Sequence, residues 1–120
     1  MRKIIAVDLD NTLAHYGSNY AIGEPIKGAK EFLLALSEIG DILIYTCRCT
    51  KEVSGNNPDL ARNKIREWLE KNEMKFDHIY IGQGKPHAHA YVDDRAVSCK
   101  PLKDFSAYEF ALEDVKELCG

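Results

Sequence analysis

Two aspartates follow the first apolar segment of the chain, within the run Val7-Asp8-Leu9-Asp10-Asn11-Thr12. The segment itself, Ile4-Ile5-Ala6-Val7, is typical of a buried strand in a parallel sheet, and ligands bind outside the carboxyl ends of such strands. Two carboxylates at that position repel each other unless a cation or a shared proton relieves the repulsion. The spacing of Asp8 and Asp10 therefore favours a catalytic site over a structural one.

Polar side chains also follow the later predicted strands. The second strand ends at Thr46, and Arg48 follows two residues later. The loop after the third strand carries Lys85, and the fourth strand is followed by Asp93 and Asp94. Because the carboxyl ends of parallel strands meet at one edge of a sheet, we expect these residues to converge with the first two aspartates. The sequence thus predicts four acids, a hydroxyl and at least one cation in one site.

The elements that must position these residues alternate between strands and helices. Apolar segments predict strands over residues 4–7, 41–46, 76–81 and 90–92. Apolar residues at helical spacing predict helices over residues 25–39, from residue 58 onward and over 106–118. This alternation indicates a central, mostly parallel sheet with helices on both faces, so the predicted fold class is α/β with three layers.

The same helical spacing predicts which side of each helix is buried. In the helix that begins at Pro58, we expect the buried residues to be Leu60, Ile65, Trp68 and Leu69. In the last helix, we expect them to be Phe110, Ala111, Val115 and Leu118.

Length and composition are those of one ordinary globular domain. The chain has 120 residues, of which 45% are hydrophobic and 29% charged, and its net charge is -3. We therefore predict a single domain over residues 1–120, with a short flap at about residues 14–24 and no general attraction to nucleic acid or membrane. Met1-Arg2-Lys3 leads straight into the first strand, and no apolar run is long enough to span a bilayer, so we expect a cytoplasmic protein.

The polar residues at the strand ends resemble, in type and order, the four motifs of the haloacid dehalogenase (HAD) superfamily. In chain order the matches are Asp8, Asp10 and Thr12 to the DxDxT motif, then Thr46, Lys85, and the acid pair Asp93-Asp94. The resemblance covers nearly the whole domain. It implies a Rossmann-like, HAD-like fold and a magnesium-dependent hydrolase or phosphotransferase, in which a phosphatase is the leading expectation.

The resemblance also implies a role for each acid. Asp8 would be the nucleophile that forms an aspartyl-phosphate, and Asp10 would be the acid/base for the leaving group and the attacking water. Mg²⁺ would be bound by the side chains of Asp8 and Asp93 and by the backbone carbonyl of Asp10. Asp94 would be a direct or a water-bridged ligand.

The phosphoryl group would be held by the Thr46 hydroxyl and the Lys85 ammonium. Arg48 is either a second phosphate clamp, since a guanidinium suits two oxygens at once, or an exposed loop cation. Thr12 is expected to brace the turn after the first strand.

Four further residues near these motifs allow two interpretations each. His87 and His89 form an HxH sequence that could bind zinc, although ordinary loop or strand histidines are favoured because Mg²⁺ already accounts for the acids. Tyr16 and Tyr20 in the flap could stack on a ring of the substrate, or they could simply pack.

The intervals between motifs leave no room for a cap domain, so the chain resembles capless members of the superfamily. An open site suits a bulky substrate, or a neighbouring subunit of a homo-oligomer covers it. The expected substrate is a phosphate monoester whose class stays open: a nucleotide, a polynucleotide end, a sugar phosphate or a phosphoprotein.

Two non-hydrolytic functions compete with the phosphatase. A receiver-like signalling module also uses acids, a hydroxyl and a lysine, but its acids are adjacent after the first strand and its lysine follows the last strand, whereas Lys85 here precedes the acid pair. A phosphate-binding module with little or no turnover is the other alternative.

Overall fold

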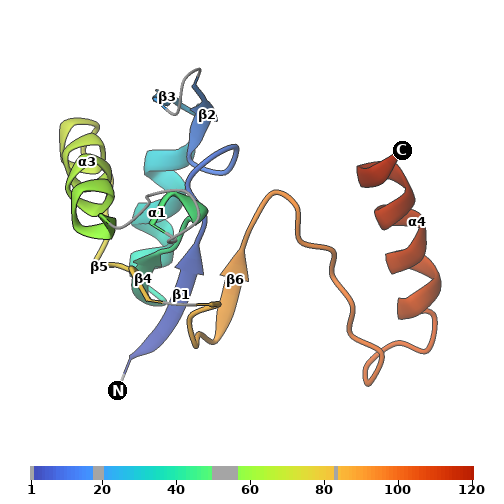
Figure 1. The fold of residues 1–120 in the computed structure, drawn as a ribbon. Helices are drawn as coiled ribbons and strands as arrows, with labels where there is room; N and C mark the ends of the chain where they lie inside the picture. Colours follow the sequence, from blue (N-terminus) through green and yellow to red (C-terminus); the bar gives the residue numbers. More distant parts are fainter. Residues whose placement is uncertain (1, 18–20, 50–56, 83) are drawn as a thin grey trace.

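The structure is a computed structural model, and it describes residues 2–17, 21–49, 57–82 and 84–120. Its centre is a four-stranded sheet built from β1 (Lys3–Val7), β4 (Gly40–Ile44), β5 (His78–Ile79) and β6 (Ala90–Val92), in the order β5-β4-β1-β6 (Figure 1). Each neighbouring pair in this sheet is parallel. The prediction of an α/β fold with a mostly parallel sheet is therefore confirmed, and the third strand is shorter than the predicted 76–81.

Among the described residues, three α-helices accompany the sheet: α1 (Ala29–Ser37), α3 (Pro58–Lys71) and α4 (Ala107–Cys119), with a short 3₁₀ helix η1 (Cys47–Cys49) after β4. The helix predicted from residue 25 begins four residues later, because Pro25 ends a strand and Gly28 adopts a left-handed φ of 91°. A helix cannot include that conformation, which glycine adopts without steric cost. By contrast, α3 begins at the predicted Pro58, where the Asn57 side chain accepts a hydrogen bond from the Leu60 N–H.

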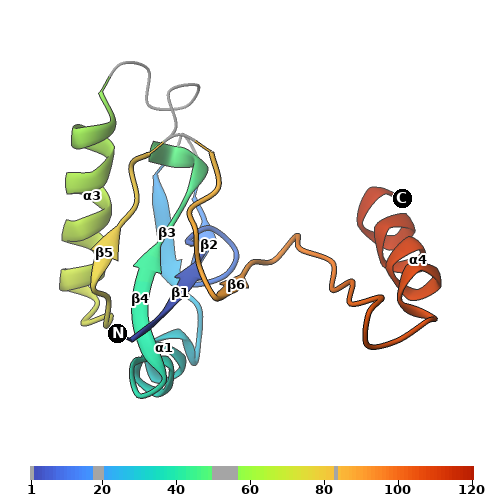
Figure 2. The same ribbon diagram turned by 90° about the horizontal axis from the view of Figure 1, so that it is seen from below.

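The core lies between one face of the sheet and two helices. Ile5 and Val7 of β1 and Ile42 and Ile44 of β4 belong to the same hydrophobic cluster as residues of α1 and α3, namely Ala29, Leu33, Ile65 and Leu69. Alternate residues of a strand face the same side, so α1 and α3 cover a single face of the sheet (Figure 2). Leu60, predicted to be buried, is instead 50% exposed, because it lies in the first turn of α3 at the margin of this cluster.

The predicted flap is a small antiparallel sheet between β1 and α1. Strands β2 (Ala14–Tyr16) and β3 (Ile22–Pro25) pair with each other, with Ala14 opposite Pro25 and Tyr16 opposite Ile22. This hairpin extends beyond the carboxyl end of β1, at the end of the molecule where the predicted site residues gather (Figure 1).

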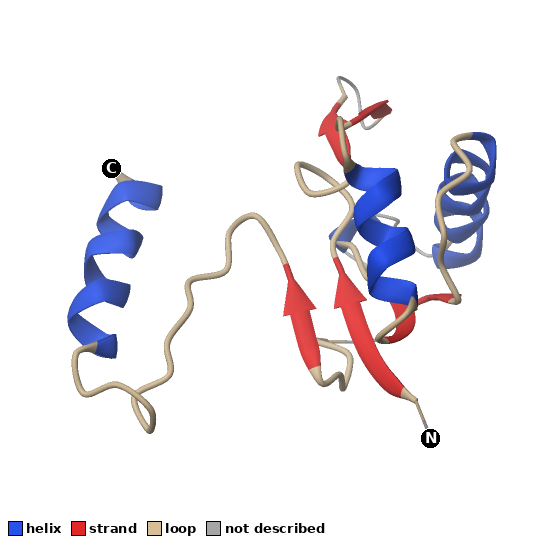
Figure 3. Ribbon diagram, turned by 180° about the vertical axis from the view of Figure 1, so that it is seen from behind, coloured by secondary structure: helices blue, strands red, loops and turns tan. Residues whose placement is uncertain are grey.

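The last helix lies where it was predicted, but the large apolar residues predicted to be buried in it are exposed. Figures 1, 2 and 3 all show α4 standing apart from the sheet, at the end of a long loop that leaves β6. Phe110, Val115 and Leu118, predicted to face inward, are 64%, 44% and 55% exposed. Helical periodicity identifies an apolar side but not the surface that covers it, which is why the prediction failed. In the described part of the chain, no helix is long and apolar enough to cross a membrane.

Candidate functional site

Three carboxylates meet at the carboxyl ends of the neighbouring strands β1 and β6. One carboxylate oxygen from each of Asp8, Asp93 and Asp94 lies within 4.8 Å of the others. Parallel pairing brings them together: Val7 is opposite Val92, and the Asp8 N–H donates to the Val92 carbonyl at 3.0 Å. Asp8 and Asp93 thus follow the last paired residues of adjacent strands. Hard oxygen donors this close together suit a divalent cation such as Mg²⁺.

The pKa of the Asp8 carboxyl is raised by its surroundings, as expected for a carboxylate in an acidic site. Partial burial and, to a smaller extent, the negative charges of Asp93, Asp94 and Asp10 together raise the pKa of Asp8 from 3.8 to about 7, although a hydrogen bond from the Leu9 N–H lowers it. Burial and like charges both disfavour the carboxylate, and a bound cation would reverse both effects.

A tyrosine that the sequence analysis did not single out anchors one of these acids. The Tyr45 hydroxyl donates to Asp93 Oδ2 at 2.9 Å. Burial would raise the pKa of Asp93, but hydrogen bonds from the Arg95 N–H and from Tyr45 hold it below its usual value. Burial likewise raises the pKa of the Tyr45 hydroxyl, so Tyr45 remains a donor. Tyr45 directly precedes Thr46 at the end of an apolar segment, and this position was the only sign in the sequence of a role at the site. In the structure, the registers Val7–Ile44 and Val7–Val92 place Asp8, Tyr45 and Asp93 at the same level of the sheet.

Asp10 lies outside the carboxylate cluster and is held by Arg48. The guanidinium donates through Nε to Asp10 Oδ2 at 2.7 Å and through Nη2 to Oδ1 at 2.9 Å. Both side chains are largely buried, at 11% and 15% exposure. The alternative of an exposed loop cation is therefore wrong for Arg48, because the 3₁₀ turn η1 directs it inward. Such a two-pronged contact fixes the orientation of the carboxylate.

Thr46 and Lys85 line one pocket of about 350 Å³ together with Asp93. Thr46 is buried, and its Oγ1 accepts the Arg48 N–H at 3.2 Å. The Lys85 ammonium lies 3.9 Å from the centre of the Tyr91 ring, a cation–π contact. The other described residues of the pocket wall are Tyr45, Cys47, Cys49, Tyr80, Gly82, Gly84, Tyr91 and Ala96. The pocket is thus a partly aromatic chamber beside the acid cluster.

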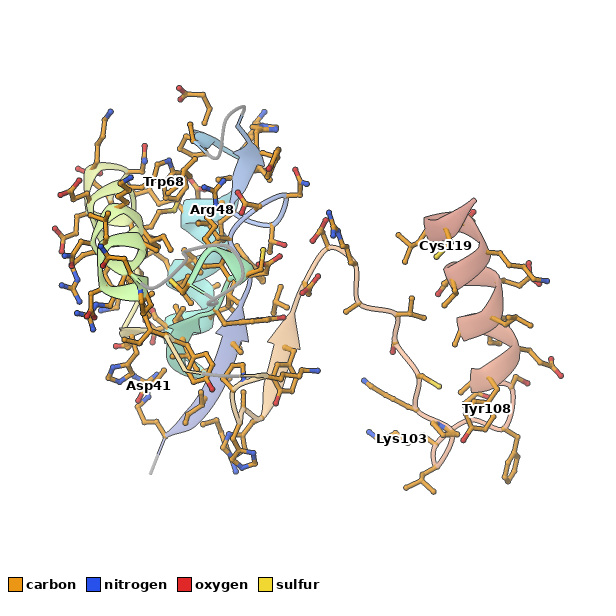
Figure 4. All side chains as sticks on the ribbon, in the orientation of Figure 1. Asp41, Arg48, Trp68, Lys103, Tyr108 and Cys119 are labelled. Atoms are coloured by element: carbon orange, nitrogen blue, oxygen red, sulfur yellow. The ribbon has the colours of Figure 1, made fainter. Side chains whose placement is uncertain are left out.

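The hairpin β2–β3 borders the Asp10 side of the site. Arg48 Nη2 donates to the Ala21 carbonyl at 3.1 Å, and its guanidinium carbon lies 5.9 Å from the centre of the Tyr16 ring. Trp68 of α3 donates from Nε1 to the Gly23 carbonyl at 3.0 Å. Figure 4 shows Arg48 and Trp68 at the end of the molecule that carries the hairpin. Tyr20, the other predicted stacking residue, lies outside the described residues.

The turn after β1 is braced by Asn11 rather than by the predicted Thr12. Asn11 adopts a left-handed φ of 61°, and its Oδ1 accepts the Tyr16 N–H at 3.3 Å. Asparagine tolerates this conformation better than most residues. The Thr12 hydroxyl is buried without a hydrogen-bond partner among the described residues. The prediction assigned the wrong side chain because both residues have turn-forming chemistry.

The HxH pair lies away from the acids. His89 precedes β6, and its Nδ1 accepts the Ile4 N–H at 3.0 Å near the start of β1. The rings of His87 and His89 are 6.5 Å apart. Asp93, in contrast, follows the carboxyl end of β6. Within the described chain, the group of potential metal ligands consists of Asp8, Asp93 and Asp94, without either histidine.

Two proteins of known structure are similar to this chain. No protein-family model matches it, and neither does any curated protein. A conserved protein from Bacteroides thetaiotaomicron is similar in structure, with a TM-score of 0.56, 25% identity, and coverage of 92% of this chain and 97% of that one. A protein from Vibrio cholerae with a crystal structure has a TM-score of 0.56 and 32% identity, over 97% of this chain and 95% of that one. The chain therefore belongs to the same family as the Vibrio cholerae protein.

Proposed function

We propose that this protein is a small, capless HAD-like phosphatase, a Mg²⁺-dependent phosphomonoester hydrolase that works through an aspartyl-phosphate intermediate. One observation carries the proposal: Asp8, Asp93 and Asp94 form a carboxylate cluster, while the Asp10 carboxylate points to Arg48 instead. This division supports a side-chain role in metal binding for the first three acids. It leaves Asp10 to contribute its backbone carbonyl and to keep its carboxylate for proton transfer.

The donor set fits Mg²⁺. Three carboxylates supply hard oxygen ligands from two adjacent strand ends, with space for further ligands on the exposed side of Asp94. When bound, the cation would neutralise the charge between the attacking carboxylate and the anionic phosphate.

The residues of the chain would then divide the reaction among them. Asp8 attacks phosphorus, an oxygen–phosphorus bond forms, and the bond to the leaving oxygen breaks as that oxygen takes a proton from Asp10. Asp10 next removes a proton from the water that hydrolyses the aspartyl-phosphate. Thr46 and Lys85 bind the phosphoryl oxygens from the pocket that they line, and Arg48 orients Asp10.

The proposed architecture is the three-layer, Rossmann-like α/β/α arrangement of that superfamily. Helices α1 and α3 form one outer layer, and α4 is the helix available for the other. The 350 Å³ pocket, with its tyrosine walls, supports a bulky leaving group. A nucleotide, a polynucleotide end, a sugar phosphate and a phosphoprotein all remain candidate substrates.

Hydrolysis of p-nitrophenyl phosphate tests the proposal. We expect turnover that requires Mg²⁺ and falls by at least about 1,000-fold in Asp8→Asn, since that change removes the nucleophile. Asp114→Asn, an equally conservative change on the exposed surface of α4, serves as the matched control and should retain full activity. Full activity of Asp8→Asn would show that the mechanism is wrong.

The bidentate Arg48–Asp10 pair also favours a second candidate, a module that binds Mg²⁺ and phosphate with little turnover, because it occupies the carboxylate that must transfer protons. The two candidates differ in a panel of phosphate esters that includes nucleotides, sugar phosphates, a phosphopeptide and oligonucleotide 3′-phosphates. Mg²⁺ binding measured by calorimetry, without turnover of any ester, would support the binding module.

A further inference from the structure

We call residues 96–120 the C-terminal arm. Most of its large apolar side chains are not buried against any other part of the chain. Leu102 and Phe105 are fully exposed in the loop that leads to α4. On α4, most of the apolar residues fall on one side of the helix, with Phe110 as the exception: Ala107, Tyr108, Ala111, Leu112, Val115 and Leu118. Figure 4 shows Tyr108 and Cys119 surrounded only by side chains of the arm. Large apolar groups that gather like this mark an interaction surface.

One face of the central sheet is not covered by a helix of the described chain. Ile4, Leu43, Tyr45 and Tyr91 point away from the core shared with α1 and α3, since they alternate with its residues along each strand. We call these four residues the open face. They are half-buried to exposed, whereas Ala6, which lies between Leu43 and Tyr91 on the same face, is buried. No helix of the described chain packs on this face (Figures 1 and 3). A parallel sheet is normally covered on both faces, so this face lacks one layer.

The surface area of the chain gives the size of the missing contact. It exposes 8433 Å², whereas a folded monomer of 13.6 kDa is expected to expose about 6,560 Å². Its radius of gyration is 15.4 Å, against about 14 Å for a domain of this length. The excess, roughly 1,900 Å² per chain, would amount to roughly 3,700 Å² over two chains, within the range of obligate homodimer interfaces.

We propose that two copies of this chain exchange their C-terminal arms, so that α4 of each copy covers the open face of the other. Each chain has both surfaces of the contact, an uncovered amphipathic helix and an uncovered sheet face. In a dimer with a two-fold axis, the helix of each chain would cover the sheet face of the other. In the described arrangement the loop after β6 already carries α4 past the edge of its own sheet (Figures 1 and 3). The partner helix would supply the third layer. This inference does not rest on the proposed phosphatase activity, but Tyr45 and Tyr91 belong both to the open face and to the pocket wall, so an exchanged arm would border that pocket.

The first test measures the mass of the full-length chain by sedimentation equilibrium. We expect a dimer with twice the 13.6 kDa of one chain. Val115→Glu, on the apolar side of α4, should weaken dimerisation by about tenfold or more, because each dimer would bury two such charges. Phe110→Glu is the matched control: Phe110 is 64% exposed and lies on the charged side of the same helix, so its replacement should change the dissociation constant less than about twofold.

The second test needs no variant and distinguishes exchange from closure of the arm on its own sheet. A dimer assembled from isotopically labelled and unlabelled chains should give nuclear Overhauser effects between chains, from the Val115 and Leu118 methyl groups to those of Ile4 and Leu43. A monomer at all concentrations would overturn the inference. So would methyl contacts confined to one chain, or a dimer that Val115→Glu leaves intact.

Discussion

The acids of the candidate site occupy two different environments. Asp8, Asp93 and Asp94 face one another within 4.8 Å, whereas the Asp10 carboxylate is neutralised by the Arg48 guanidinium. A bound cation would reduce the repulsion among the three clustered carboxylates, whereas Arg48 compensates the charge of Asp10. The cluster and Asp10 are therefore suited to different tasks. The hydroxyl of Tyr45 adds a fixed donor to Asp93 and orients it toward the cluster.

At this residue scale, the raised pKa of Asp8 predicts how stability depends on pH without Mg²⁺. Because the folded-state pKa of about 7 lies above the ordinary aspartate pKa of 3.8, the native state holds the proton more tightly than the unfolded state does. The resulting stabilisation is complete below about pH 4 and is lost as pH rises through about 7. The melting temperature of the wild type, minus that of Asp8→Asn, should therefore fall over this range.

Saturating Mg²⁺ provides the control for that experiment. Binding requires the ionised carboxylate, so the cation should raise the melting temperature of the wild type more at pH 8 than at pH 5, and should have a much smaller effect on Asp8→Asn. A difference between wild type and Asp8→Asn that stays constant with pH would contradict the prediction.

Arg48 permits a second prediction at the residue scale. Arg48→Lys keeps the charge but cannot contact Asp10 Oδ1 and Oδ2 in the same forked geometry. If Asp10 transfers protons, its misorientation should lower kcat by about 10- to 100-fold with a smaller effect on KM. Arg66→Lys, on the exposed side of α3, is the matched control. An increase in kcat would instead identify the Arg48–Asp10 pair as inhibitory.

At the scale of elements, the hairpin β2–β3 depends on side chains from other parts of the chain. Trp68 of α3 and Arg48 of η1 each donate to a backbone carbonyl of the hairpin. A two-stranded hairpin is marginally stable alone, so such contacts hold it beside the site.

Removal of one anchor should loosen the hairpin selectively. Trp68→Phe retains an aromatic ring but removes the Nε1 donor to the Gly23 carbonyl, and should reduce the free energy of unfolding by about 1 kcal/mol. Hydrogen–deuterium exchange should accelerate at the amides of residues 14–17 and 21–24, while amides of Ile42 and Ile44 in the sheet keep their protection. Equal acceleration in both regions would indicate global destabilisation and contradict the assigned role.

Sequence patterns predicted elements well where local chemistry decides them. Pro58 with its preceding Asn57 begins α3 as expected, and the apolar segments of β1 and β4 were located within one or two residues. The start of α1 was wrong because the left-handed Gly28 could not be read from periodicity. Tyr45 was missed because its role depends on the register between strands that are distant in sequence.

At the scale of the whole molecule, arm exchange predicts that stability depends on protein concentration. If folding is coupled to dimerisation, each tenfold dilution should lower the melting temperature of the wild type. The Val115→Glu variant should melt at a lower temperature than the wild type at every concentration, because its dimer is weaker, whereas Phe110→Glu should behave as the wild type does. A melting temperature of the wild type that is independent of concentration would argue for a self-sufficient monomer.

The order of strands and helices along the chain, and the residue types at the strand ends, could be predicted from local periodicity and from the polarity of individual positions. Which of those side chains meet depends on contacts between segments that are distant in sequence. Strand register places Asp8 with Asp93 and Tyr45, and the turn of η1 directs Arg48 to Asp10. That α4 leaves its own sheet uncovered could not be predicted either, since an amphipathic helix encodes an apolar side but not the surface against which that side packs.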